Sequence, residues 1–356
     1  MSTAKFEKFE MKYGYMLPKE FKDFMLRHGG DSQFGSCRFE YPDNIINNLL
    51  RLPGDMDFHL VPFGDIGNGD YYCFYRYGIN IDDYYVGIWL HETHNFVILA
   101  STFKSFMYKC LLDDFLSMID PIEDLSDEEI QMANLESMER GMELSEEFGF
   151  DIEKVKKMKD EVDYHKLMIN YDDRAVQSLC YIGKWMFNID KNKGLFYLKK
   201  AYDACKYYTA PYYIAGRMLV DDEQESINFL TKSLKTSLVL TGFSYWQEDF
   251  LEIPEDVHRE VALILDDELK DSKDTFEKRL YMGEDPYSVE LRMDMARKYS
   301  KMKLYDMSIN EYNNALYCAE DNQTKKEILK EALDVINFSG MYFLKKIVEY
   351  DIRRLK

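Results

Sequence analysis

The tetrapeptide His91-Glu92-Thr93-His94 is the part of this sequence that most resembles a metal site. A zincin motif needs two histidines four residues apart on one helix, so that both face the same ion. Here the spacing is one residue short, and the flanking residues predict a turn between two strands. We therefore expect no metal at this turn, and we expect no cofactor.

The segment Gly64–Asp70 contains three glycines, at Gly64, Gly67 and Gly69. A phosphate-binding loop would continue into Lys-Ser/Thr and a helix, and neither follows. A calcium loop would carry a ladder of oxygen ligands, which is also missing. The glycines therefore indicate a backbone that turns sharply between two strands.

The cysteines give no sign of metal binding, disulfides or catalysis. No two form a CxxC pair, and most lie among apolar residues, as reduced core thiols do. The six positions are Cys37, Cys73, Cys110, Cys180, Cys205 and Cys318. No Ser-His-Asp or Cys-His arrangement can be argued from the sequence, so we expect a protein that is not an enzyme.

The chain is acidic, and its charge is uneven. It has 356 residues, of which 46% are hydrophobic, and a formal net charge of −20. Residues 121–174 carry −10 of that charge, whereas residues 1–120 carry −6. An acidic protein repels phosphates, so we expect no nucleic-acid partner, and it attracts basic proteins. The alternative is that the charge serves only solubility.

The N-terminal sequence favours the cytoplasm. The first twenty residues are charged throughout and do not resemble a signal peptide. No apolar run approaches the 18 or more residues of a membrane span. We expect a soluble, cytoplasmic protein with no membrane partner and with all six thiols reduced.

Residues 1–120 predict an α+β domain with an antiparallel sheet and flanking helices. A helix opens at Leu17-Pro18 and ends at Gly29-Gly30, and a closing helix from Phe103 carries an apolar stripe that includes Phe106. Short strand patterns separated by turn residues predict a meander between these helices. The strands are expected at 34–41, 60–63, 71–77, 84–90 and 95–100.

The rest of the chain predicts helices. Residues 121–163 form an acidic helical linker, and residues 164–356 form an all-α domain. Segments 178–201, 210–234 and 291–316 repeat a pattern of small and aromatic residues that resembles tetratricopeptide and Sel-type repeats. We expect proteolysis near 121–165 to release a stable fragment of about 120 residues, the size of the predicted first domain.

An ordered set of motifs in the first domain resembles the SUKH (Smi-Knr) superfamily. It begins with Leu17-Pro18 and the Gly29-Gly30 pair, and continues with the glycine turn of Gly64, Gly67 and Gly69. Trp89 and the Phe103–Phe106 segment look like the closing strand and helix. The resemblance covers about residues 5–120 and implies a binding role, because many bacterial members are immunity proteins that neutralise toxins, often nucleases.

The candidate partner-binding residues are acids beside aromatic rings at strand turns. Carboxylates complement a basic partner, and tyrosine is a frequent interface hot spot. The candidates are Asp65, Asn68, Asp70, Asp82, Asp83, Tyr84, Tyr85 and Glu92. The alternative is a solvated hairpin whose tyrosines pack inward.

The leading hypothesis is an immunity protein that blocks a basic toxin domain by occlusion. The alternative is an adaptor or regulatory scaffold with no toxin partner. A weaker third possibility is an enzyme hidden in the helical half. The sequence leaves the toxin, the binding surface and the oligomeric state open.

Overall fold

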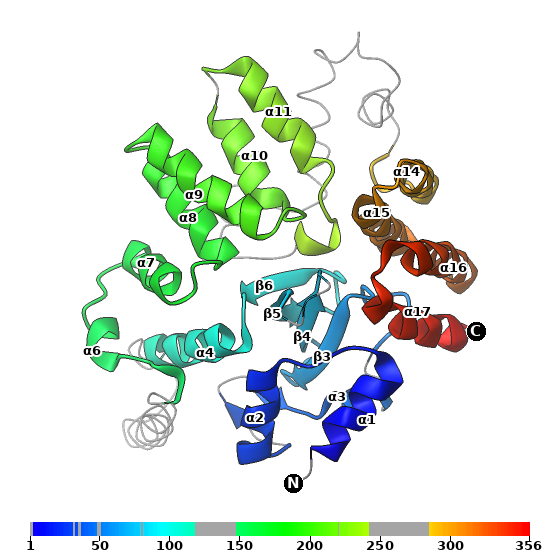
Figure 1. Cartoon of the computed structure of the whole chain (residues 1–356). Helices are drawn as coiled ribbons and strands as arrows, with labels where there is room; N and C mark the ends of the chain where they lie inside the picture. Colours follow the sequence, from blue (N-terminus) through cyan, green and yellow to red (C-terminus); the bar gives the residue numbers. More distant parts are fainter. Residues whose placement is uncertain are drawn as a thin grey trace.

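The computed structural model describes residues 3–30, 33–34, 37–47, 51–78, 80, 82–117, 147–219, 221–241 and 285–356. The N-terminal part is an antiparallel sheet with flanking helices, and the C-terminal part is helical (Figure 1). This confirms the predicted α+β domain followed by a helical-repeat region. The predicted linker, 121–163, lies outside the described residues up to residue 146.

The sheet is a meander whose six strands, within the described part, lie in chain order and pair antiparallel. They are β1 (Gln33–Phe34), β2 (Cys37–Phe39), β3 (Leu60–Asp65), β4 (Tyr71–Arg76), β5 (Tyr84–Trp89) and β6 (Phe96–Ala100). The last four agree with the prediction. The single strand predicted at 34–41 is wrong: two short strands lie there and pair with each other, Gln33 with Arg38 and Phe34 with Cys37.

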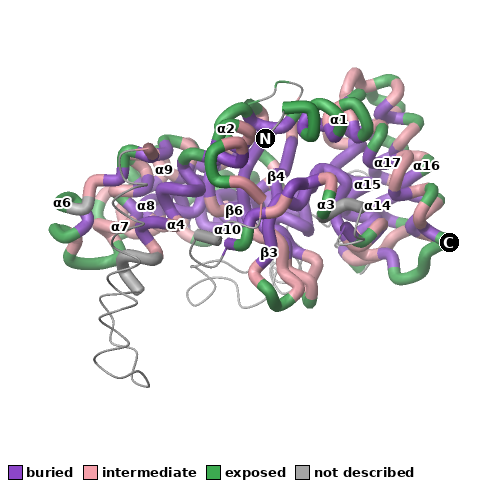
Figure 2. Tube along the Cα trace, turned by 90° about the horizontal axis from the view of Figure 1, so that it is seen from below, coloured by how far each residue is buried: buried purple, intermediate pink, exposed green. Residues whose placement is uncertain are grey.

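The central strands are buried on both faces. Side chains alternate along a strand, so Phe74 and Val86 face one side while Tyr75 and Tyr85 face the other. The first side is covered by α2 (Lys19–His28) and α4 (Phe103–Ser117), with α1 (Ala4–Tyr13) and α3 (Pro42–Asn47) beside them. Figure 2 colours most of the central strands as buried.

The helical region contains the three predicted repeats as helix pairs. The pairs are α8 (Val176–Phe187) with α9 (Lys191–Ala204), α10 (Thr209–Met218) with α11 (Glu223–Ser233), and α14 (Val289–Lys301) with α15 (Tyr305–Cys318). Helices α6 (Ile152–Val155) and α7 (Glu161–Tyr171) precede the three pairs, and α16 (Asn322–Ser339) and α17 (Tyr342–Arg354) follow them. The 3-10 turn η1 (Val239–Thr241) comes after the second pair. No described helix is both long and apolar enough to cross a bilayer.

Small residues allow the paired helices to approach closely. A Cβ atom on Gly183 would lie 2.8 Å from Leu198, and one on Gly216 would lie 2.7 Å from Leu230. These are equivalent positions in the first two pairs, and both approaches are too close for a side chain. The predicted small-residue pattern therefore has a packing role.

The two parts of the chain share their cores. Helices α8–α10 cover the second face of the sheet, where Tyr75 and Tyr85 pack with Leu198 and Tyr213. On the other side, α17 packs against α1. This packing bears against the expectation that the first 120 residues form a separable unit.

A fully buried ion pair also joins the two parts. Arg51 lies in the segment before β3, and its Nη2 is 2.9 Å from Asp351 Oδ2 on α17. Both side chains have no exposed surface. The guanidinium also donates to the backbone carbonyl of Asp57, at 3.2 Å. Residues 300 positions apart therefore form one polar contact within the core.

Candidate partner-binding site

Two turns meet at one end of the sheet, here called the acidic end, where four of the predicted residues lie: Asp65, Asn68, Asp70 and Glu92. Asn68 and Asp70 are in the β3–β4 turn, and Glu92 is in the β5–β6 turn beside His91, which was not among the predicted residues. The backbone N–H of His91 donates to Asp70 Oδ1 at 2.9 Å, and the His91 ring lies 2.7 Å from the same oxygen. Gly69 has φ +105° where the first turn passes the His91 ring, which explains the glycine there.

Asp70 is the acceptor that holds the two turns together. Partial burial works to raise its pKa, but hydrogen bonds from the His91 backbone, the His91 ring and the Asn68 amide outweigh that effect. The pKa of Asp70 therefore lies below its usual value, and the carboxylate is charged at neutral pH. Asn68 completes the turn, because its Oδ1 accepts from the Asp70 N–H at 3.0 Å.

The other two residues at this end differ in exposure. Asp65 is buried, and its Oδ2 lies 3.0 Å from Arg38 Nη2, so its charge is matched within the sheet. Glu92 is exposed at the tip of the β5–β6 turn. Of the predicted acids at this end, Glu92 is thus the one most open to a partner.

Asp82 and Asp83 lie at the opposite end of the sheet, in the turn between β4 and β5. Asp83 Oδ2 accepts from the backbone N–H and the side-chain amide of Asn80, at 3.0 and 2.9 Å. Asp82 is exposed. The predicted residues therefore form two separate groups rather than one surface.

Tyr84 and Tyr85 do not offer exposed rings, so the prediction that they bind a partner needs correction. Both are buried, at 3% and 0% exposure. The Tyr84 hydroxyl accepts from the Phe103 N–H at 3.0 Å, and the Tyr85 hydroxyl donates to the Ala204 carbonyl. Burial raises the pKa of both phenols. The alternative of tyrosines packed inward describes them, because strands buried on both faces leave no outward ring.

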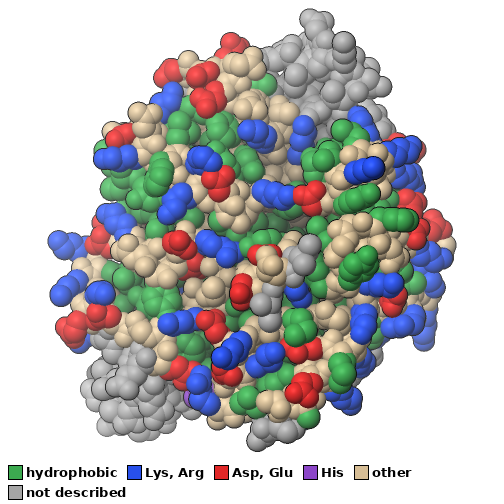
Figure 3. All heavy atoms as spheres, viewed as in Figure 1, with side chains coloured by type: hydrophobic (Ala, Val, Ile, Leu, Met, Phe, Trp, Pro, Cys, Tyr) green, Lys and Arg blue, Asp and Glu red, His purple; other side chains and the backbone are tan. Residues whose placement is uncertain are grey.

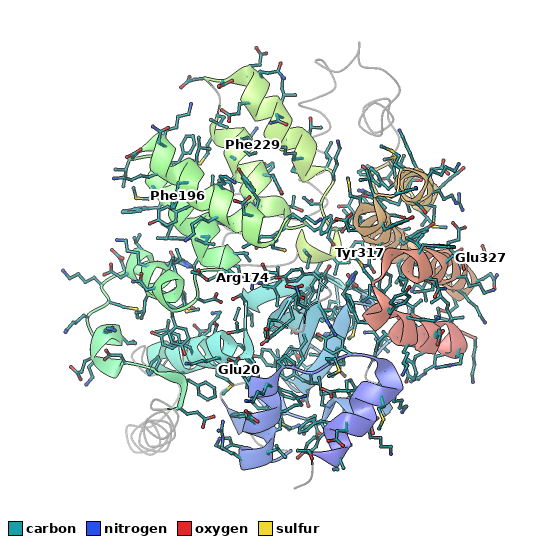
Figure 4. All side chains as sticks on the ribbon, viewed as in Figure 1. Glu20, Arg174, Phe196, Phe229, Tyr317 and Glu327 are labelled. Atoms are coloured by element: carbon teal, nitrogen blue, oxygen red, sulfur yellow. The ribbon has the colours of Figure 1, made fainter. Side chains whose placement is uncertain are left out.

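A cavity of about 630 Å³ lies beside the acidic end, and sequence reasoning missed it. Thr93 and His94 of the β5–β6 turn form one wall, and Asp285, Tyr317 and Glu320 of the helical region form another. The walls come from segments about 200 residues apart, so no local motif could have shown it. Figure 4 shows Tyr317 beside η1, between the helical region and the sheet.

His94 shapes the sheet side of this cavity. Its backbone has φ +57°, which is uncommon for a residue other than glycine, and its ring stacks on Trp89 with centroids 5.7 Å apart. Burial lowers the pKa of His94, and the nearby Asp55 opposes that effect only in part. The ring is therefore neutral at pH 7.

The residues that carry the family motif have structural roles. Leu17, Pro18, Trp89, Phe103 and Phe106 are buried. The glycines sit where the backbone turns or packs closely: Gly29 and Gly67 have positive φ, Gly30 lies against Tyr41, and Gly64 lies against Cys37 and Arg38. The motif thus identifies the sheet and its first helices and contributes no exposed site.

Residues 1–109 match the SMI1 / KNR4 family (SUKH-1). The resemblance to the SUKH superfamily inferred from the motifs is confirmed for this part of the chain, here called the SUKH-1 domain. No curated protein matches the chain. Among solved structures, the chain is similar to the crystal structure of MamA at 14% identity, over 56% of this chain and 94% of that one. The TM-score of that superposition is 0.20.

The SUKH-1 match ends inside α4, so the cavity lies where the SUKH-1 domain meets helices outside the match. The described residues hold no group of three His, Cys, Asp or Glu placed for a metal ion. All six cysteines fall in the described ranges and are thiols. Burial raises the pKa of the Cys205 thiol to about 12, although nearby backbone N–H groups and cations oppose it, so it is a poor nucleophile.

Proposed function

We propose that this chain is a non-enzymatic, cytoplasmic protein that binds another protein, namely an immunity protein that neutralises a toxin of a bacterial polymorphic toxin system. The SUKH-1 match supports the proposal, because that family includes immunity proteins. The binding site is proposed from one observation: the β3–β4 and β5–β6 turns meet, and Glu92 is exposed there. A cavity lies beside these turns, and its other wall includes Asp285 and Glu320.

A basic toxin is the partner that this arrangement favours. The net charge of −20 would speed the encounter, and salt would screen it. Nuclease toxins hold phosphates in basic clefts, so the positive potential of such a cleft can also attract an acidic inhibitor. We propose neither a nucleic-acid nor a membrane partner for this surface.

Charge alone does not select the surface. On the face seen in Figure 3, acidic and basic side chains are interspersed over the described residues. Selection of the partner must therefore also depend on the shape of the surface, and the cavity next to Glu92 provides a concave surface that a partner can fit. Affinity would come from partner groups buried there, while the rim charges set the association rate.

The second candidate is an adaptor or scaffold that acts through the helical repeats. One observation favours it: Ile189 and Phe196 of the first repeat are 64% and 57% exposed. Large exposed apolar side chains on a repeat array are typical of a protein-binding face.

The test uses the toxin encoded beside the gene. We expect 1:1 binding, protection of cells that express the toxin, and association that slows as salt rises. Glu92→Lys should slow association about threefold or more at low salt, because it reverses a rim charge. Asp82→Lys makes the same charge change at the far end of the sheet and should have little effect.

The outcomes separate the candidates. If the chain protects cells from no candidate toxin, the immunity proposal fails. If Glu92→Lys and Asp82→Lys both leave binding intact while Phe196→Ala abolishes it, the repeats are the binding surface.

A further inference from the structure

Most of the large hydrophobic side chains that are exposed in the described part of the chain lie at two turns of the C-terminal helices and near the end of α1. The α14–α15 turn carries Met302 and Leu304. The α16–α17 turn lies between Phe338 and Tyr342, which are 76% and 61% exposed. Six of the nine such side chains belong to this group, here called the tip patch: Met11, Met16, Met302, Leu304, Phe338 and Tyr342.

An ion pair shows that the two turns lie at the same level. Short turns connect α14, α15 and α16, so α14 and α16 run side by side in the same direction (Figure 1). Arg297 on α14 has its Nη2 2.8 Å from Glu331 Oε1 on α16. Leu304 follows Arg297 by seven residues, and Phe338 follows Glu331 by seven residues. Both apolar turns therefore project at the same end of these helices.

The start of α17 holds the end of α1 beside these turns. The ammonium group of Lys346 donates to the backbone carbonyl of Met11. The rings of Tyr13 and Tyr350 also pack edge to face, with centroids 5.6 Å apart. Tyr342 begins α17 one turn before Lys346, so Met11 and Tyr342 lie in the same region of the surface.

A buried arginine places the remaining member of the patch. The guanidinium of Arg76 lies over the rings of Tyr15 and Phe343, 5.5 and 4.4 Å from their centroids. Both rings are buried. Met16 and Tyr342 are the chain neighbours of these two residues, so their exposed side chains emerge in the same region.

The three segments that carry the tip patch are basic. Residues 11–17, 301–304 and 338–346 contain five lysines and no acidic residue, whereas acids outnumber bases by 65 to 45 in the whole chain. Lys303 and Lys346 are among the exposed lysines. Figure 3 shows hydrophobic side chains beside Lys and Arg over α14–α17. The patch is therefore both apolar and positive, unlike the chain as a whole.

Neighbouring acids do not cancel this charge. The two acids within two positions of these segments are Glu10 and Asp306, and they pair with Lys22 and Lys206. Charges beyond a Debye length of about 8 Å are screened at physiological ionic strength, so the local lysines act on a bound partner more strongly than the net charge of −20. A symmetric contact with a second copy would bring these lysines together, which disfavours a dimer here. The charge instead favours an anionic partner with an apolar part.

We propose that the tip patch docks on an anionic lipid bilayer. A flat partner fits this arrangement, because apolar side chains project from separate turns at one level and a plane can reach all of them. Aromatic rings such as those of Phe338 and Tyr342 favour the membrane–water interface. Lysine stems lie along apolar surface while their ammonium groups meet phosphates. An acidic protein would instead need a surface shaped to the separate turns.

This inference goes beyond the proposed function and does not depend on it. The expectation of no membrane partner rested on the lack of an apolar run long enough to span a membrane. Such a run is not needed for docking, because the side chains of the turns enter only the boundary between headgroups and acyl chains. The cavity beside the acidic end includes the α15–α16 turn, at the opposite end of these helices, so a toxin and a bilayer would not compete.

Co-sedimentation of the full-length chain with lipid vesicles tests the proposal. Vesicles made of equal parts phosphatidylcholine and phosphatidylglycerol are compared with vesicles of phosphatidylcholine alone. We expect binding to the mixed vesicles that weakens as salt rises. Binding to phosphatidylcholine alone should be about tenfold weaker, because the lysines lose the anionic headgroups. No binding to the mixed vesicles would overturn the proposal.

Two pairs of variants locate the contact. Phe338→Gln and Lys303→Gln should each weaken binding to the mixed vesicles about fivefold, because each removes one group from the patch. The controls Phe196→Gln and Lys191→Gln make the same changes on α9, outside the patch, and should bind as the wild type does. All four side chains are exposed, so we expect the variants to fold.

Two further results would contradict the proposal. Equal losses in Phe338→Gln and Phe196→Gln would show that the contact is not made by the tip patch. If a soluble peptide of alternating glutamate and leucine binds, loses binding in Phe338→Gln, and the vesicles do not bind, the patch is a site for an acidic protein. Neither result bears on toxin binding, so the immunity proposal is tested separately.

Discussion

The SUKH-1 domain covers much of one face of the sheet with its own helices, whereas helices that follow the domain cover the other face. On one face, Phe63 and Phe74 pack against Phe103 of α4, all within the SUKH-1 domain. On the other face, Tyr75 and Tyr85 pack against helices α8–α10, which follow the domain in the sequence. The comparison teaches that a boundary in sequence pattern need not be a boundary in packing. The helical repeats complete the core of the domain that precedes them.

The largest expected effect comes from separating the two parts. Cleavage between residues 117 and 147 should leave both fragments associated in native buffer, because they share the second-face core. Residues 1–117 alone would expose Leu60, Tyr75, Tyr85, Phe96 and Ile98, and should aggregate. Size-exclusion chromatography of the nicked chain and of the isolated fragment checks this. A monomeric, folded fragment 1–117 would show that the second face needs no cover.

The second prediction concerns the buried Arg51–Asp351 ion pair, which joins the segment before β3 to α17. Asp351→Asn should destabilise the chain by about 3–5 kcal/mol, because it leaves a buried guanidinium without its counter-charge. Glu331→Gln is the control: it removes the charge from the partly exposed pair with Arg297, at 2.8 Å, keeps an oxygen for the Tyr312 hydroxyl, and should cost less than about 1 kcal/mol. Urea unfolding measures both. Equal small losses would mean that this link contributes little.

His165 should make the covering helices sensitive to acid. It is buried in α7, and burial, aided by the charge of Lys109, lowers its pKa to about 3. Below about pH 6.5 the unfolded chain binds a proton that the folded chain does not, so stability falls as pH falls. The wild type should lose about 1 kcal/mol more per pH unit than His165→Gln between pH 6 and 4. Parallel stability curves for the two proteins would contradict this prediction.

Tyr84 and Tyr85 lie on opposite faces of the sheet, so removing the hydroxyl of each compares the stability of the two faces. Tyr84→Phe removes the acceptor of the buried Phe103 N–H and should cost about 1–2 kcal/mol. Tyr85→Phe removes the donor to the Ala204 carbonyl across the second face and should cost about 1 kcal/mol. Thermal unfolding of the two variants measures the difference. No loss in Tyr85→Phe would mean that the contact with α9 is weak.

Much of the fold could be predicted from the sequence because its determinants are local. Short apolar runs separated by turn residues, the Leu17-Pro18 helix start and the small residues Gly183 and Gly216 each act within one or two elements. The burial of the second face had one sequence sign: Tyr71–Tyr77 is apolar at nearly every position, which is typical of a strand covered on both sides.

The candidate site could be predicted only in part. The pairing of Asp70 with His91 follows from the meander, since both turns lie at the same end of the sheet. The cavity could not be predicted from the sequence, because Thr93 and Glu320 come together only when the helical region packs on the sheet. No local motif indicates how these helices pack. The two tyrosines were misjudged because rings beside two acids at a strand entry resemble an interface hot spot. A single backbone partner for each hydroxyl is enough to bury such a ring.

The most direct test of the account is hydrogen exchange of the full chain, alone and in complex with the toxin encoded beside the gene. We predict that binding slows exchange in the turns 66–70 and 91–94 and at the end of α15, residues 316–320. Exchange in the opposite turn, residues 82–83, should not change. Slowed exchange confined to α8 and α9, with the 66–70 and 91–94 turns unaffected, would contradict the proposal that the acidic end of the sheet binds the partner.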